Sequence, residues 1–155
     1  MDIEVNNRQQ LLAVDESQIC AQIRQLLAEE GVRRGEVSVA IIDDAEIHEL
    51  NRIHLQHDYP TDVLSFVLER DGDFLIGEVI VSAEMALSRC CEYDWSAECE
   101  LALYWIHGVL HLVGYRDKLE ADVIVMRQRE QHYLQRFGWD ASRNAASLDR
   151  NLDRA

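Results

Sequence analysis

The chain has 155 residues, of which 29 are acidic and 15 are basic, and its formal net charge is −14. Hydrophobic residues make up 48% of the chain, which excludes a disordered or fibrous protein and predicts a single globular domain. The acidic balance excludes binding to nucleic acid through a broad basic surface, so a local patch or a metal ion would have to attract any RNA or DNA.

The first residues, MDIEVNNRQQ, contain neither the basic nor the apolar region of a secretory signal. The longest apolar stretch, residues 101–115, includes two histidines and two glycines and is too short to span a membrane. We therefore expect a cytoplasmic protein that does not bind membranes. The cysteines have no metal-binding or disulfide-type spacing and are expected to be free thiols: Cys20, Cys90, Cys91 and Cys99.

Strand and helix patterns alternate along the first part of the chain. Strands are predicted at residues 2–7 and 36–43, where β-branched and apolar residues alternate with polar ones. Helices are predicted at residues 16–30 and 43–55, where apolar residues recur at helical spacing. The single proline, Pro60, then marks a loop.

Two strands and three helices are predicted in the remainder of the chain. The strands are expected at residues 62–69 and 74–82, with a turn at residues 70–73. The helices are expected at about residues 83–93, 96–113 and 118–136. This order, βαβαββααα, predicts an α/β (α+β) fold in which a small mixed sheet of about four strands is packed with about five helices. The domain is predicted to occupy residues 1–137, followed by a polar tail at residues 138–155.

Basic residues gather at few places in this acidic chain. A solvated loop or helix face is the predicted setting of these arginines: Arg33, Arg34, Arg127, Arg129 and Arg136.

The segment HGVLHLVGYRD, residues 107–117, carries the strongest functional signal. His107 and His111 are four residues apart on a predicted helix, so their imidazoles share one face and can reach the same ion. Gly114 permits a sharp turn that can bring Asp117 back to this point. Two imidazoles, one carboxylate and an open position form the arrangement of catalytic zinc. We therefore predict a metal site, holding one Zn²⁺ ion per chain, on this helix and the following turn.

Other interpretations of this segment stay open. Histidines on an apolar helix face are usually hydrogen-bonded core residues. Gly108 stands where the HExxH motif of zinc proteases has its catalytic glutamate, which argues against standard peptide hydrolysis. Glu100 lies on the same helix face as His107 but too far away to be a ligand, so it is either a cleft residue or a solvated charge. A non-haem iron enzyme also uses two histidines and one carboxylate, although with a different spacing.

Three blocks of the sequence resemble the YbeY endoribonucleases, the ribosomal-RNA maturation factors. HGVLHLVGYRD is similar to the family pattern His-Gly-x-Leu-His-Leu-x-Gly-Tyr-Asp-His. LNRIHLQHDYPTDVLSF, residues 50–66, is similar to Leu-Asn-x-x-x-Arg-x-x-Asp-x-Pro-Thr-Asp-Val-Leu-Ser-Phe, and IGEVIVS, residues 76–82, to Leu-Gly-Asp-Ile-x-Ile-Ser. Met126 also falls where the family has a methionine. The blocks keep their order and spacing from about residue 36 to residue 136.

The resemblance implies a zinc-dependent endoribonuclease that cuts single-stranded RNA, matures the 3′ end of 16S rRNA and takes part in ribosome quality control. It implies a zincin-like metal site and, as partners, rRNA and the small ribosomal subunit or ribosome-associated proteins. By position, His107 and His111 match the first two zinc ligands. Thr61, Asp62 and Ser65 follow Pro60 and are either cleft residues or structural hydrogen-bonding residues.

The sequence departs from the family pattern around the metal and at one arginine. Asp117 stands where the family has a third histidine ligand, and it makes the centre less positive, so we expect weaker activation of water and a rate optimum at higher pH. Arg116 replaces an aspartate and either restores positive charge near the cleft or is an exposed loop residue. Leu55 replaces an arginine suited to holding phosphate. An alternative function is therefore a ribosome-associated binding factor that keeps the metal but has weak catalysis.

Overall fold

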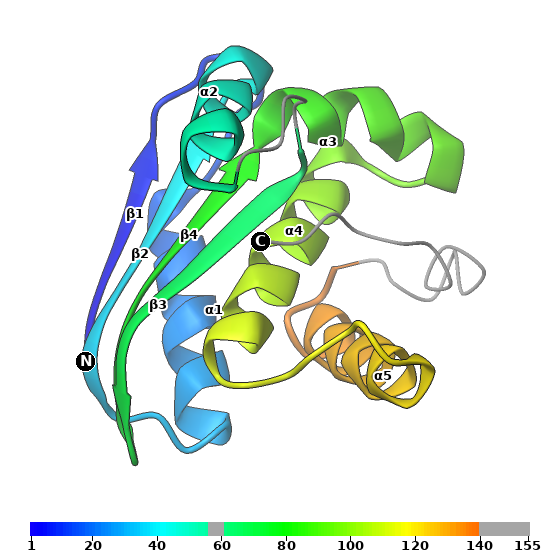
Figure 1. The fold of residues 1–155 in the computed structure, drawn as a ribbon. Helices are drawn as coiled ribbons and strands as arrows, with labels where there is room; N and C mark the ends of the chain where they lie inside the picture. Colours follow the sequence, from blue (N-terminus) through cyan, green and yellow to red (C-terminus); the bar gives the residue numbers. More distant parts are fainter. Residues whose placement is uncertain (56–60, 140–155) are drawn as a thin grey trace.

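The computed structural model describes residues 1–55 and 61–139, except the side chains of His54 and Leu55. These residues form a four-stranded sheet with the strand order β1-β2-β4-β3 (Figure 1). The strands are β1 (Asp2–Asn7), β2 (Arg34–Ile42), β3 (Val63–Asp71) and β4 (Phe74–Ser82). β1, β2 and β4 run parallel, and β3 pairs antiparallel with β4. The predicted mixed sheet is confirmed.

The described part of the chain also contains five α-helices. They are α1 (Glu16–Glu29), α2 (Asp44–Leu55), α3 (Ala83–Arg89), α4 (Ala97–Leu112) and α5 (Glu120–Arg136). The helix predicted at about residues 83–93 is α-helical only to Arg89, and a 3₁₀ helix, Cys90–Tyr93, completes the range. The chain then passes through Asp94, whose φ of 57° is left-handed and incompatible with a continuing α-helix.

The helices are divided unequally between the two faces of the sheet (Figure 1). α1 and α4 pack against one face, and α3 and α5 pack against α4. The strand residues that face α1 and α4 are buried and apolar, as Val39 and Val79 show. Strand residues of the opposite alternation contact α2, which covers part of the other face through Ile47 and Leu50.

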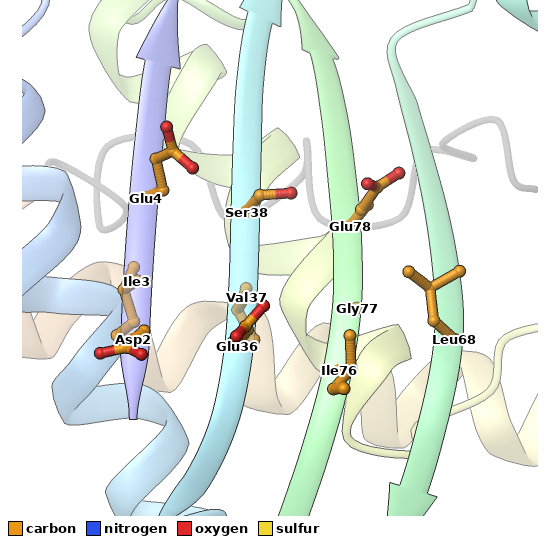
Figure 2. Close-up of a pocket in the computed structure, with 10 residues that line it drawn as sticks. All are labelled: Asp2, Ile3, Glu4, Glu36, Val37, Ser38, Leu68, Ile76, Gly77 and Glu78. Carbon is orange, nitrogen blue, oxygen red and sulfur yellow. The ribbon is translucent and has the colours of Figure 1, made fainter.

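The remainder of that other face forms an open, shallow hollow of about 270 Å³ (Figure 2). Four carboxylates line it: Asp2, Glu4, Glu36 and Glu78. Leu68 of β3 borders the hollow and is 62% exposed. This face of the sheet is therefore strongly acidic and repels other anions.

α4 lies at the centre of the molecule and is buried on nearly all sides, which explains its almost continuous apolar sequence. Gly108 permits this close packing, because an added Cβ would lie 2.5 Å from Cγ1 of Val79. The Ser65 hydroxyl of β3 donates a 3.1 Å hydrogen bond to the carbonyl of Gly108. These contacts fix the position of α4 along the sheet. They therefore also fix the position of His107, the residue before Gly108.

None of the helices in the described ranges is long and apolar enough to cross a membrane. The cysteines are free, as expected: Cys20, Cys90, Cys91 and Cys99. Residues 140–155 of the predicted tail lie outside the described residues, so the domain boundary at residue 137 stays a prediction.

Candidate metal centre

His107 and His111 lie one helical turn apart near the C-terminal end of α4. Their Nε2 atoms are 3.0 Å apart. The side chain of His107 is fully buried, whereas that of His111 is 20% exposed. The pair therefore lies at the border between the core and the solvent, where a ligand can reach it.

The chain returns to these two histidines because α4 ends in a Schellman motif. The backbone N–H groups of Gly114 and Tyr115 donate to carbonyls in the last turn of the helix, and Gly114 adopts a φ of 111° that suits glycine. The turn carries Asp117 into a buried position beside the imidazoles. Its Oδ2 lies 3.0 Å from Nε2 of His111 and 3.2 Å from Nε2 of His107.

Two nitrogens and one oxygen thus form a triangle with sides of 3.0 to 3.2 Å. Ligand atoms at about 2.0–2.1 Å from a tetrahedral zinc ion are roughly 3.3–3.4 Å apart, close to the spacing found here. The three residues form a group able to hold a metal ion. They fit zinc in number, type and spacing, and a tetrahedral ion would retain one further position.

The hydrogen bonds on the far side of each imidazole determine which nitrogen can bind a cation. Nδ1 of His107 lies 2.7 Å from Oε2 of Glu130, and Nδ1 of His111 lies 3.0 Å from the carbonyl oxygen of Tyr115. A carbonyl oxygen and a carboxylate can only accept, so both Nδ1 atoms donate. In neutral imidazoles both Nε2 atoms then carry lone pairs, and these face each other and the carboxylate of Asp117. Three acceptors directed at one point repel one another, so either a metal ion or a proton on an imidazole Nε2 must lie between them.

Glu130 and Arg127, both on α5, support this arrangement from behind. Glu130 is fully buried and accepts two hydrogen bonds, of 2.8 and 2.7 Å, from Nη1 of Arg127. A carboxylate held in this way orients the imidazole of a metal-binding histidine and increases its basicity. Arg127 is buried against Glu130, so the predicted solvated setting is wrong for this arginine.

The protonation equilibria of the centre also favour positive charge. Burial opposes the imidazolium form of His107, but hydrogen bonds with Asp117 and Glu130 outweigh it and raise the pKa of His107. Burial opposes the carboxylate form of Asp117, but hydrogen bonds from both histidines outweigh it and hold the pKa of Asp117 far below its usual value. The centre thus keeps the Asp117 carboxylate ionised, and a metal ion would displace the Nε2 proton of His107.

The other predicted cleft residues have different settings. The Ser65 hydroxyl donates to the backbone of α4, so of the two predicted roles the hydrogen bond matches the structural one. Asp62 is fully buried and accepts a 3.0 Å hydrogen bond from Nη1 of Arg89. Thr61 is buried, and its hydroxyl has no hydrogen-bond partner among the described residues. Arg116 is exposed on the loop next to Asp117.

Of two further expectations, the structure tests the one for Glu100 and does not describe the side chain concerned in the one for Leu55. Glu100 is fully buried, and its Oε1 accepts a 2.8 Å hydrogen bond from Nε1 of Trp95, so the expected solvated charge is wrong. Its burial follows from the central position of α4. Leu55 is the last residue of α2, and its side chain and residues 56–60 lie outside the described part of the chain.

Sequence reasoning did not identify Glu130, Arg127 or the Tyr115 carbonyl as parts of the site. A backbone carbonyl leaves no trace in a sequence. Glu130 lies 23 residues after His107, and an Arg–Glu pair three residues apart on a helix has the pattern of a surface ion pair. Only the packing of α5 against α4 shows that this pair is buried.

Known proteins with a similar sequence are endoribonucleases by name. A family model described as endoribonuclease YbeY matches residues 4–138. The chain is 40% identical over 138 residues to the endoribonuclease YbeY of Carboxydothermus hydrogenoformans, covering 87% of this chain and 96% of the relative. It is 38% identical over 153 residues to the endoribonuclease YbeY of Moorella thermoacetica, covering 89% and 98%.

A solved structure also resembles the fold. The solution structure of TM1509 from Thermotoga maritima matches with a TM-score of 0.66 at 25% identity, and the match covers 96% of each chain.

Proposed function

Because the chain belongs to the endoribonuclease YbeY family, we propose that it is a zinc-dependent endoribonuclease that cuts single-stranded RNA. Its substrate in the cell is rRNA, at the 3′ end of 16S rRNA, and it takes part in ribosome quality control in the cytoplasm. The small ribosomal subunit or ribosome-associated proteins are its partners. The names of the relatives and the sequence blocks around the two histidines support this assignment.

The convergence of three acceptor atoms on one point is the observation that supports a metal enzyme. His107, His111 and Asp117 would hold the ion, and Glu130 and the Tyr115 carbonyl keep both Nε2 atoms available to it. Bound zinc supplies a positive charge that polarises a phosphoryl oxygen and acidifies water.

The residues around the centre would divide the remaining tasks. Ser65 and Gly108 hold α4 on the sheet and so position His107. Arg116 is exposed beside Asp117, where its guanidinium can contact a phosphate of the RNA. Asp62 is engaged by Arg89 and acts as a structural residue.

Zinc content and cleavage of RNA by the same samples test the proposal. We expect about one zinc ion per chain in the wild-type protein, with a large loss in His111→Ala, and cleavage of a single-stranded but not a double-stranded RNA. His132→Ala is a matched control, because His132 is only partly exposed on α5 and contacts Glu29 rather than the candidate metal ligands. Full zinc content and full cleavage in His111→Ala would exclude this centre as the active site.

A second function is favoured by Leu55, which replaces the arginine of the family pattern, and by the net charge of −14. In this case the protein binds the ribosome and keeps the metal for stability, with little catalysis. Leu55→Arg discriminates between the two functions. A large gain of RNA cleavage in this variant, from an almost inactive wild type, supports the binding factor, whereas strong cleavage by the wild type excludes it.

A further inference from the structure

Glu30 makes an unusual set of contacts outside the candidate metal centre. It is the C-cap residue of α1, and its side chain is only 12% exposed. Its carboxylate accepts hydrogen bonds from Oη of Tyr115 at 3.0 Å, Oη of Tyr133 at 2.7 Å and Nη2 of Arg129 at 2.5 Å. One carboxylate thereby connects α1 to the loop after α4 and to α5.

This position is unfavourable for a glutamate unless its partners compensate. A negative charge at the C-terminal end of a helix is repelled by the helix dipole, and burial adds a desolvation penalty. Arg129 supplies the opposite charge, and its guanidinium also lies over the ring of Tyr133 and donates to its hydroxyl. Burial and the bond to Glu30 raise the pKa of Tyr133, so this phenol remains a donor.

The partners of Glu30 are also connected to both imidazoles of the candidate centre. Tyr115 donates its hydroxyl to Glu30, while its own carbonyl accepts from Nδ1 of His111. On α5, Arg129 precedes Glu130, whose carboxylate accepts from Nδ1 of His107. Glu30 therefore contacts the two segments that orient the metal-binding nitrogens, although it lies in the first helix of the chain.

We propose that Glu30 is a positioning residue that sets the zinc affinity of the centre by holding Tyr115, and through its carbonyl His111, in place. This role rests on the proposed metal centre. Without the bond to Glu30, the Tyr115 side chain loses its link to α1, and the loop between Gly114 and Asp117 gains freedom. The Tyr115 carbonyl then orients His111 less well, and Asp117, on the same loop, is held less firmly.

The test measures zinc affinity by competition with a chromogenic chelator and, separately, the visible absorption of the Co²⁺-substituted protein. Glu30→Gln retains the shape of the side chain but presents an amide donor to Tyr115 or Arg129. We expect zinc affinity to fall about tenfold, the lower end of the effect of groups that orient metal ligands. Glu29→Gln is the matched control, since Glu29 is the neighbouring residue and contacts His132, Tyr133 and Arg136 but not Tyr115, through which Glu30 is proposed to act. It should keep the wild-type affinity and Co²⁺ spectrum.

Tyr115→Phe tests the route from the other side, because it removes the hydroxyl and leaves the carbonyl. If Glu30 acts through Tyr115, this variant loses a similar factor of affinity, and the double variant loses no more than the larger single effect. Circular dichroism shows whether Glu30→Gln folds. If it does not fold, the zinc affinity of Tyr115→Phe alone tests the proposal.

The outcomes separate positioning from simple stabilisation. Lower thermal stability with zinc affinity and Co²⁺ spectra equal to those of Glu29→Gln would overturn the role. A loss in Glu30→Gln that Tyr115→Phe does not share would overturn it as well. If the wild-type protein binds no zinc, the proposed metal centre fails together with this role, whereas absence of RNA cleavage by zinc-loaded protein affects the proposed function alone.

Discussion

Asp117 determines the charge of the candidate metal centre. Its carboxylate adds a negative charge where a histidine would leave the ion uncompensated, and a less positive centre acidifies water less. In Asp117→His we therefore expect a higher kcat/KM for RNA at neutral pH and a rate optimum at lower pH than in the wild type. The measurement is the pH profile of kcat/KM at equal zinc content. Superimposable profiles would show that the charge of this ligand does not govern the reaction.

Glu130 is the residue that fixes the orientation of His107. Glu130→Gln removes the negative charge from the hydrogen bond with Nδ1 and from the buried ion pair with Arg127. We expect zinc affinity to fall by about 10–100-fold, measured by chelator competition. Glu98→Gln, on the exposed side of the first turn of α4, is the control and should have no effect. Equal affinity in both variants would mean that His107 needs no carboxylate to orient it.

At the level of elements, the contact between α4 and the sheet controls both stability and the site. In Gly108→Ala the new methyl group meets Cγ1 of Val79 at 2.5 Å, so either the packed side chains of β3 and β4 or α4 itself must shift. We expect a loss of about 1–3 kcal/mol in the free energy of unfolding, measured in urea, together with weaker zinc binding because His107 moves. Gly72→Ala is the comparison, since its Cβ meets no atom within 4 Å and only the left-handed backbone is strained. Weaker zinc binding in both variants would show that the loss of zinc binding does not depend on the position of α4.

The elements also show which parts of the structure could be predicted from the sequence. Local patterns identified the strands, the position of α4 and the convergence of His107, His111 and Asp117, because helix periodicity and a glycine turn act over few residues. The 3₁₀ helix after α3 was not distinguished from an α-helix, because residue spacing over one short turn does not separate the two, although the predicted end at residue 93 agrees with the left-handed Asp94. Glu100 and Glu130 were missed as buried residues because burial of a glutamate depends on elements that pack only in the folded chain.

For the whole molecule, the distribution of charge constrains how RNA can approach. The open face of the sheet carries Asp2 and Glu36 directly opposite each other on neighbouring strands, and Glu4 and Glu78 lie on either side of Ser38 (Figure 2). The candidate metal centre lies on α4, which packs against the other face. RNA is therefore expected to approach from the side of α4, where the centre attracts phosphate, while the sheet repels it.

This balance predicts an unusual salt dependence. Proteins that neutralise 6–10 phosphates lose about 10³–10⁵ in affinity between 50 and 200 mM salt, because counterions compete with their basic residues. Here the net charge is −14, and added salt screens the repulsion of RNA as well as the local attraction. We expect the affinity for a 2′-O-methylated single-stranded RNA, which resists cleavage, to change less than about tenfold over this range, measured by fluorescence anisotropy. The double variant Glu36→Gln/Glu78→Gln should bind more tightly at low salt and converge with the wild type at high salt. A steep loss of wild-type affinity would instead reveal an extended basic contact with RNA. Equal affinity of the double variant and the wild type at low salt would show that the acidic sheet does not influence binding.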